Sequence, residues 1–206
     1  MFRLSMSVAR SRSSSSLKTA AVWLSLCAVA PSFATDVEMT EFYSTPLNYY
    51  FITATATDKV ALDGMPGWAR TGKSFMVGDA EMAGAVPLTR FYFDGVAHNK
   101  ERGSHFYTVV ESERAALRAM NPSNAAAAGL PVDEGSSGYV YAPVVVGLGF
   151  GTYCASPLTP VYRAFRGSAR FPDDPNHHFS TNLAAHSALI AAGWDDDGLV
   201  FCVSAN

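Results

Sequence analysis

A short sequence motif recurs three times in this chain, and it constrains the fold more than any other feature of the sequence. The copies are NYYFITATATDKVAL, GSHFYTVVESERAAL and NHHFSTNLAAHSAL, at residues 48–62, 103–117 and 176–189. Phe51, Phe106 and Phe179 coincide in this alignment, and a threonine follows each of them two residues later. An internal repeat of this kind indicates a domain in which one supersecondary unit is used several times.

A second shared segment closes each copy. GWARTGKSF (67–75) and GWDDDGLVF (193–201) both carry Gly-Trp and then Gly-x-x-Phe, and the middle copy keeps only GYVY (138–141). Aromatic runs precede the second and third copies, with Arg90 and Arg163 three residues after a proline. The agreement of these offsets predicts three divergent units, at residues 37–80, 85–143 and 159–204.

Within a unit the residue types predict the order strand–strand–helix–strand. Aromatic runs such as RFYF and HFYT are typical of strands. Thr108 and Glu111 have the spacing of a capping box at the start of a helix, and Gly-Trp is expected to end that helix. The expected fold class is α+β, with three such repeats in an approximate pseudo-threefold arrangement. Within the middle unit, 121–137 is expected to be an exposed loop, and the apolar segment 143–154 that follows is expected to be a buried strand.

The first 34 residues predict export. They contain four basic residues and no acidic one, then the apolar run TAAVWLSLCAVA, and they end in PSFA. This is the pattern of a secretory signal peptide cleaved after Ala34. A lipoprotein acylated at Cys27 is the alternative, although its recognition box requires a small residue where Leu26 stands. Residues 35–206 are then expected to form a single periplasmic or extracellular domain without a membrane-spanning segment.

Cleavage at that point changes the charge and the cysteine count. It leaves 11 Lys and Arg against 18 Asp and Glu, a formal net charge of −7, which disfavours binding to nucleic acid. Two cysteines remain, Cys154 and Cys202. An even number in an exported chain predicts a disulfide, with two buried free thiols as the alternative.

The units resemble an uncharacterised repeat of unknown function that occurs, often in threes, in exported bacterial and some fungal proteins. PVYRAF, HHFST and GWDDDGLVF in the third unit carry the resemblance, as do LTRFYF, SHFYT and GYVY in the second. The resemblance covers essentially all of the mature chain. The middle unit departs from it by lacking Gly-Trp, and Ser180 replaces the usual tyrosine. The resemblance implies an accessory or binding role beside secreted enzymes or wall-associated modules, and it transfers no catalytic residue.

Tyr50, His105 and His178 fall in one column of the aligned copies. Tyr and His share a flat ring with a polar edge, which fits a structural role, a ligand-binding surface or a metal ligand. A metal ligand is disfavoured, because metal sites need fixed ligand types and geometry. Closure of the units around a threefold axis would bring these three rings together. His186, on a helix face, is expected to be structural.

Arg90 and Arg163 also recur, either as ion pairs between units or as contacts to an anion or to sugar hydroxyls. These arginines and the three rings are the candidate ligand-binding residues. The candidate core aromatics are Phe51, Phe106, Phe179, Trp68 and Trp194, with sugar stacking as the alternative role of the two tryptophans.

Recognisable catalytic motifs are missing from the sequence. It has no nucleophile elbow and no calcium-loop spacing, and a cysteine nucleophile would have to come from the predicted disulfide. We therefore expect no cofactor, no metal and no catalysis. The expected function is that of an exported accessory module that binds a cell-wall or other extracellular glycan, since repeated weak sites gain avidity on a polymer. A protein-interaction or structural module at the cell surface is the alternative, and a metal-dependent hydrolase is the third candidate.

Overall fold

The structure is a computed structural model that describes residues 35–93, 103–127, 129–147, 151–167 and 174–205. The expected signal peptide with Cys27 lies outside these residues, as does most of the connectors at 95–104 and 167–176. Contacts divide the chain into Met1–Ser32 and Phe33–Asn206, and every element described below belongs to the second part.

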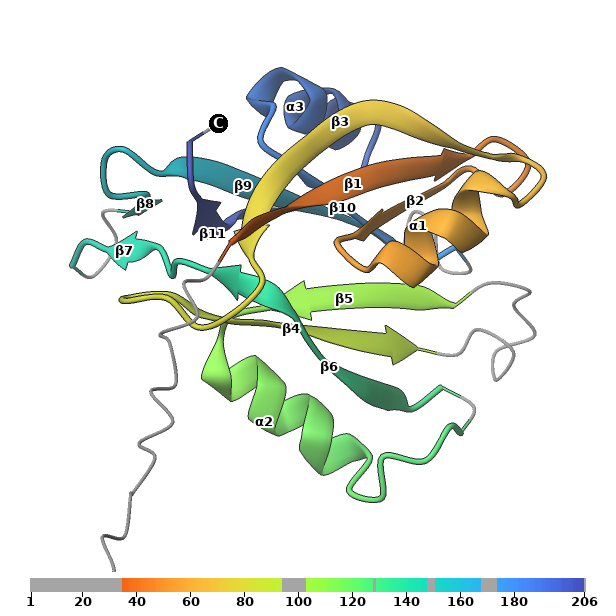
Figure 1. The fold of residues 1–206 in the computed structure, drawn as a ribbon, viewed down its shortest axis with the longest axis horizontal. Coiled ribbons are helices and arrows are strands. Elements are labelled where there is room, and N and C mark those ends of the chain that lie inside the picture. Colours follow the sequence, from red (N-terminus) through yellow and green to blue (C-terminus); the bar gives the residue numbers. More distant parts are fainter. Residues whose placement is uncertain (1–34, 94–102, 128, 148–150, 168–173, 206) are drawn as a thin grey trace, which may run out of the picture. The chain divides into compact units, whose positions relative to one another are not determined.

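The order strand–strand–helix–strand occurs three times along the described chain (Figure 1). The first group consists of β1 (Asp36–Ser44), β2 (Tyr49–Thr53), α1 (Ala56–Asp63) and β3 (Trp68–Gly78). The second consists of β4 (Val86–Phe93), β5 (Ser104–Thr108), α2 (Glu111–Met120) and β6 (Pro131–Val140). The third consists of β9 (Thr159–Arg166), β10 (Asn176–Ser180), α3 (Leu183–Ala191) and β11 (Asp195–Val203). Two short strands, β7 (Val144–Val145) and β8 (Thr152–Tyr153), precede the third group.

Strand pairing is antiparallel throughout, and the first strand of each group is the central one. β1 lies between β2 and β3, β4 between β5 and β6, and β9 between β10 and β11. A single pairing of Gly78 with Tyr139 joins the first two groups into one sheet of six strands, and the third group forms its own sheet. The expected mixed class, with antiparallel sheets and helices, is confirmed.

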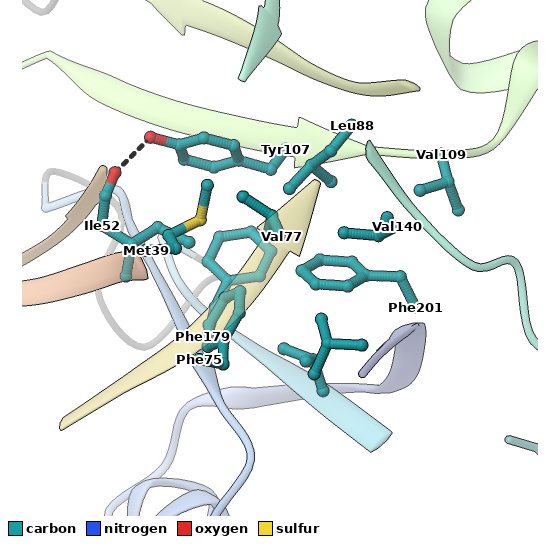
Figure 2. Close-up of a cluster of buried hydrophobic side chains, with 12 residues drawn as sticks. Met39, Ile52, Phe75, Val77, Leu88, Tyr107, Val109, Val140, Phe179 and Phe201 are labelled. Carbon is teal, nitrogen blue, oxygen red and sulfur yellow. Dashed lines mark hydrogen bonds between the residues drawn. The ribbon is translucent and has the colours of Figure 1, made fainter. Parts of the chain in front are cut away.

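The three groups bury their apolar side chains against one another in a shared core (Figure 2). Its members are Met39, Ile52, Phe75, Val77, Leu88, Tyr107, Val109, Val140, Val161, Phe179, Phe201 and Val203. Burial of each large apolar side chain contributes about 1.5–3 kcal/mol. Tyr107 also donates a hydrogen bond from its hydroxyl to the carbonyl oxygen of Ile52, which ties β5 to β2 inside the core.

The predicted disulfide between Cys154 and Cys202 is confirmed, with the two Cα atoms 5.7 Å apart. It encloses a sequence separation of 48 residues. Closure of a loop of this length removes chain entropy from the unfolded state, which is worth about 4 kcal/mol of stability. The backbone of Cys202 also pairs with that of Tyr141, so both sides of the β7–β8 segment are fixed to β11.

The segment 143–154 is not the buried strand that its apolar residues predict. β7 and β8 pair with each other as a small hairpin, and Val145 is 73% exposed. The reversal is possible because Gly147 and Gly151 adopt positive φ angles, which glycine accepts without steric cost.

The expected loop at 121–137 is also wrong in its second half, because β6 begins at Pro131 and pairs with β4. Its sequence, PVDEGSSGYV, is poor in strand-forming residues. The pairing with β4 imposes a strand that local propensity does not indicate.

The expected capping box of Thr108 and Glu111 is not formed. Thr108 is the last residue of β5, and Val110 occupies the N-cap position of α2 without a side-chain hydrogen bond. The Thr108 hydroxyl instead accepts from the N–H of Val110 and donates to Glu113. The hydroxyl stabilises the turn between strand and helix, and the carboxylate that it holds takes part in the site described next.

Candidate functional site

In the structure, the third copy of the repeated motif is offset by one residue from the alignment that the sequence suggested. Thr53, Thr108 and Ser180 end β2, β5 and β10, and each hydroxyl accepts the N–H of the residue two positions later. It follows that His177, not His178, takes the position of Tyr50 and His105. The sequence alignment matched the three phenylalanines with one another. In the structure, Phe179 corresponds to the buried Ile52 and Tyr107 and not to Phe51 and Phe106.

This equivalent position carries a ring that packs on a ring of the adjacent central strand. The three pairs, with their ring-centre distances, are Tyr50 with Tyr43 (4.8 Å), His105 with Tyr92 (4.8 Å) and His177 with Phe165 (4.5 Å). Cross-strand aromatic pairs of this kind stabilise antiparallel sheets.

The next position on the same strands makes contacts between groups. Each ring there presents its face or edge to the ring position of a neighbouring group, and the third contact returns to the first group. The contacts are Phe51 with His105 (4.6 Å), Phe106 with His177 (5.2 Å) and His178 with Tyr50 (4.5 Å). Of the three rings that the sequence aligned, Tyr50 and His178 therefore touch, and His105 packs against Phe51 and Tyr92.

The two candidate arginines occupy equivalent positions on central strands and bind carboxylates in the same way. Arg90 reaches Asp58 of the preceding group at 2.7 Å and Glu134 of its own group at 2.8 Å. Arg163 reaches Glu113 of the preceding group at 3.6 Å and Asp197 of its own group at 2.7 Å. Each arginine thus joins two groups through an ion pair.

Glu134 and Asp197 reach these arginines because both are extra residues in β-bulges. The register of β6 and β11 shifts at these two residues, and each is followed by a glycine with positive φ, Gly135 at 84° and Gly198 at 70°. A bulge of this kind re-aims one side chain out of the ladder. Sequence reasoning missed both acids, although the acid-Gly dipeptide of the GWDDDGLVF and VDEGSS segments is the signal for them.

In the first group the arginine position is taken by Glu41, which is buried together with His178. The two side chains are 3% and 2% exposed, and the Glu41 carboxylate lies 2.8 Å from His178 Nε2. Thr71, at the bulge position, donates a hydrogen bond to Glu41. Burial alone would raise the pKa of Glu41, but the hydrogen bonds and charges of His178, Thr71 and Lys73 lower it overall. This pair links the third group to the first.

A groove of about 600 Å³ opens where the first group meets the second. Its walls are mostly apolar and aromatic, and they include Tyr49, Phe51, Leu62, Met65, Trp68 and Tyr92. Its polar lining consists of Asp58, Arg90, His105 and Glu134. The groove therefore unites two candidate ligand-binding residues, Arg90 and His105, with two of the candidate core aromatics. Tyr50, His178 and Arg163 do not belong to its lining.

The charges in the groove are two carboxylates and one guanidinium. Burial alone would raise the pKa of Asp58, but hydrogen bonds from Arg90 and Thr53 lower it. Burial raises the pKa of Glu134 despite Arg90, and the charge of Asp58 acts in the same direction. Burial, assisted by the charge of Arg90, lowers the pKa of His105 to about 3, so this ring is neutral near pH 7.

The candidate core aromatics divide into two sets. Phe179 and Trp194 are buried, at 3% and 7% exposure. Phe51, Phe106 and Trp68 are half-buried. Their remaining surface lies at the contacts between groups, where Phe51 and Trp68 line the groove and Phe106 lies beneath the Arg163 guanidinium.

His186 is buried beside Asp196, with Nε2 2.9 Å from the carboxylate, as expected for a structural histidine.

Among the described residues, no group of three or more His, Cys, Asp or Glu side chains could hold a metal ion. No helix in that part of the chain has the length and apolar character needed to cross a membrane.

A protein-family model described as "Domain of unknown function (DUF5648)" matches residues 23–129 and 132–204 of the chain. No curated protein matches the sequence, and no solved structure matches the fold.

Proposed function

Because the chain belongs to the DUF5648 family of unknown function, its role has to be inferred from its own structure, and we propose that it is a non-catalytic glycan-binding module. The ligand class is a cell-wall or other extracellular polysaccharide, and the module acts as an accessory outside the cytoplasm. The observation that carries this proposal is the open groove between the first two groups.

The chemistry of the groove fits a sugar. Phe51, Trp68 and Tyr92 supply ring faces for the C–H surface of a pyranose, and aromatic side chains provide such contact area without a charge. Asp58, Arg90 and Glu134 supply fixed polar groups for hydroxyls. Ligand sites commonly combine apolar walls with a few placed polar groups that orient the ligand.

We further infer that the three groups are copies of one unit with an approximate pseudo-threefold arrangement. The three contacts of rings between groups support this, since each joins one group to the next and the last returns to the first. The two Arg–carboxylate links follow the same order. In this arrangement, the groove is one of three related junctions and differs from the others in its side chains.

Export is part of the same proposal. The signal-peptide pattern of residues 1–34 carries it, and the disulfide between Cys154 and Cys202 is consistent with an oxidising compartment. A glycan-binding module of the cell envelope would meet its ligand there.

Retention on insoluble polysaccharides tests the function. The mature chain is incubated with peptidoglycan, chitin and cellulose, and bound protein is measured after washing. We expect retention on at least one of them and a loss of about tenfold in affinity for Trp68→Leu, which keeps apolar volume but removes the ring face. Tyr153→Ala, an exposed aromatic on β8, is the matched control and is expected to bind normally. The proposal fails if no polymer retains the wild-type chain.

A protein-interaction module is the second candidate, and the β7–β8 hairpin favours it. Val144, Val145, Val146 and Tyr153 are exposed there, and no charged residue occurs between Gly135 and Tyr162. The matching surface is the same hairpin of a second copy. If no polysaccharide is bound, this candidate requires a concentration-dependent dimer in sedimentation that Val145→Asp abolishes, because a buried charge would prevent the contact.

A further inference from the structure

We infer that the groove between the first and second groups selects glycans that carry a protonated primary amine, such as a sugar whose amino group is not acetylated. This inference rests on the proposed glycan-binding function and specifies its ligand. It follows from the charge of the groove, from the hydrogen-bonding groups that remain available and from a comparison with the second junction.

The described side chains that line the groove carry one more negative charge than positive. Asp58 and Glu134 both pair with Arg90, which is the one guanidinium among them, and His105 contributes no charge near neutral pH. All three ionised groups are partly buried, with Arg90 15%, Asp58 29% and Glu134 27% exposed. A partly buried surplus carboxylate favours a ligand that brings a positive charge and disfavours an acidic one.

The polar atoms available to a ligand are mainly acceptors. Arg90 donates a hydrogen bond from Nη1 to Asp58, and its Nε is buried 2.8 Å from Glu134 in an ion pair without hydrogen-bond geometry. His105 Nε2 lies 3.5 Å from Glu134, and its Nδ1 is buried. The carboxylate oxygens of Asp58 and Glu134, whose side chains are 29% and 27% exposed, are the acceptors that the groove presents. An ammonium group has three donors and no acceptor, so it matches this set better than a hydroxyl or an acetamide.

The aromatic walls add to the same preference. A cation over the face of an aromatic ring is attracted by the ring quadrupole, and the attraction increases when the site is shielded from water. Phe51, Trp68 and Tyr92 line the groove around the two carboxylates. An N-acetylated sugar would use these rings for stacking but would leave the surplus charge unmatched.

The second junction shows that this environment accommodates a cation. There, Arg163 places its guanidinium 4.5 Å from the centre of the Phe106 ring, beside Glu113 and Asp197. Phe51 is the equivalent ring at the first junction, and it lines the groove. At the first junction Arg90 is the equivalent of Arg163 and already pairs with both carboxylates, so a ligand ammonium would share Asp58 and Glu134 with it beside the aromatic wall.

Titration calorimetry with soluble probes tests the inference near neutral pH, where primary amines are still largely protonated and carboxylates are ionised. The probes are a glucosamine oligomer, the matching N-acetylglucosamine oligomer and lysine amide. We expect the glucosamine oligomer to bind about tenfold more tightly than its acetylated counterpart, the size of one charge-assisted hydrogen bond. Lysine amide, which lacks the sugar faces, is expected to bind weakly.

Two variants locate the effect. Glu134→Gln keeps the shape of the side chain and removes the surplus charge, so it should abolish the preference for the amine and bring the affinities of the two oligomers together. Asp197→Asn removes the equivalent bulge carboxylate at the second junction and should change neither affinity. Melting temperatures confirm that both variants are folded.

The outcomes separate the two proposals. Equal or tighter binding of the acetylated oligomer, or a preference that survives Glu134→Gln, overturns the inference and leaves glycan binding intact. Binding of lysine amide as tight as that of the glucosamine oligomer also overturns it, because the amine would then be recognised without the sugar. Failure of both oligomers to bind overturns the inference, and the proposed function is overturned with it only if peptidoglycan, chitin and cellulose also fail to retain the wild-type chain.

Discussion

His105 and His177 occupy the same position in two groups, and both are half-buried rings beside an arginine. Burial and the charge of Arg90 lower the pKa of His105 to about 3, and burial and the charge of Arg163 do the same for His177. Neither ring can therefore serve as a proton donor near neutral pH while the domain is folded. Their role in the folded state is that of flat, neutral rings that pack against Phe51 and Phe106 of the neighbouring groups.

The lowered pKa values of these two histidines make the folded domain less stable in acid. The ordinary pKa of 6.5 applies to the unfolded chain and about 3 to the folded one, so between these values the unfolded state binds more protons. Stability must then fall as the pH drops below 6.5. We expect His177→Phe to reduce this fall by about 1 kcal/mol per pH unit in urea unfolding measured above pH 5, where carboxylates contribute little. Identical slopes for the variant and the wild type would contradict the assignment.

At the scale of single elements, the β-bulges of β6 and β11 determine which side chains reach the junctions. Without the extra residue, Glu134 and Asp197 would follow the regular alternation of the strand and would not meet the arginines. The glycine after each acid makes the bulge possible, because its positive φ is unfavourable for a residue with a Cβ atom.

Alanine substitutions test the role of these glycines. A Cβ atom at Gly135 or Gly198 would meet no heavy atom within 4 Å, so only the backbone conformation is strained. We expect Gly135→Ala and Gly198→Ala each to cost about 1–2 kcal/mol in urea unfolding. Only Gly135→Ala should also weaken glycan binding, because only Glu134 lines the groove. Asparagine, which tolerates positive φ better, serves as the milder control at each position.

At the scale of the whole domain, the ends of the described chain are held together by different chemistry from the middle. Arg–carboxylate pairs join the first group to the second and the second to the third. The third group meets the first through the buried pair of His178 and Glu41, and Asn176 adds hydrogen bonds to the backbone N–H and carbonyl of Tyr50. These contacts join segments that are far apart in the sequence.

Removal of one partner from the buried pair should be costly. His178→Phe leaves the Glu41 carboxylate buried without its main partner, and we expect a loss of about 3 kcal/mol in the free energy of unfolding. The double variant with Glu41→Gln should recover part of this loss, because the stranded charge is gone. Additive effects in this double-mutant cycle would show that the two side chains do not act as a pair.

Much of the fold could be predicted from local patterns. The strand–strand–helix–strand order, the class of the fold and the disulfide follow from residue types and spacing that depend on short-range chemistry. The groove could be predicted only in part. Arg90, His105, Phe51 and Trp68 were recognisable because they recur along the sequence. Asp58 lies in a segment without a distinctive pattern, and the Glu-Gly dipeptide at Glu134 indicates a bulge but not the residues that the side chain meets.

The sequence by itself determined the order of strands and helices within each group, because alternation, turn residues and aromatic runs act within a few residues of one another. Only the tertiary structure decided the alignment of the third motif, in which Phe179 corresponds to Ile52 and Tyr107 and not to the phenylalanines that it resembles in sequence. It also decided that 143–154 folds into an exposed hairpin and that β6 starts at Pro131. In each case the deciding contacts come from a distant strand, and cross-strand pairing outweighs the weak preference of the local sequence.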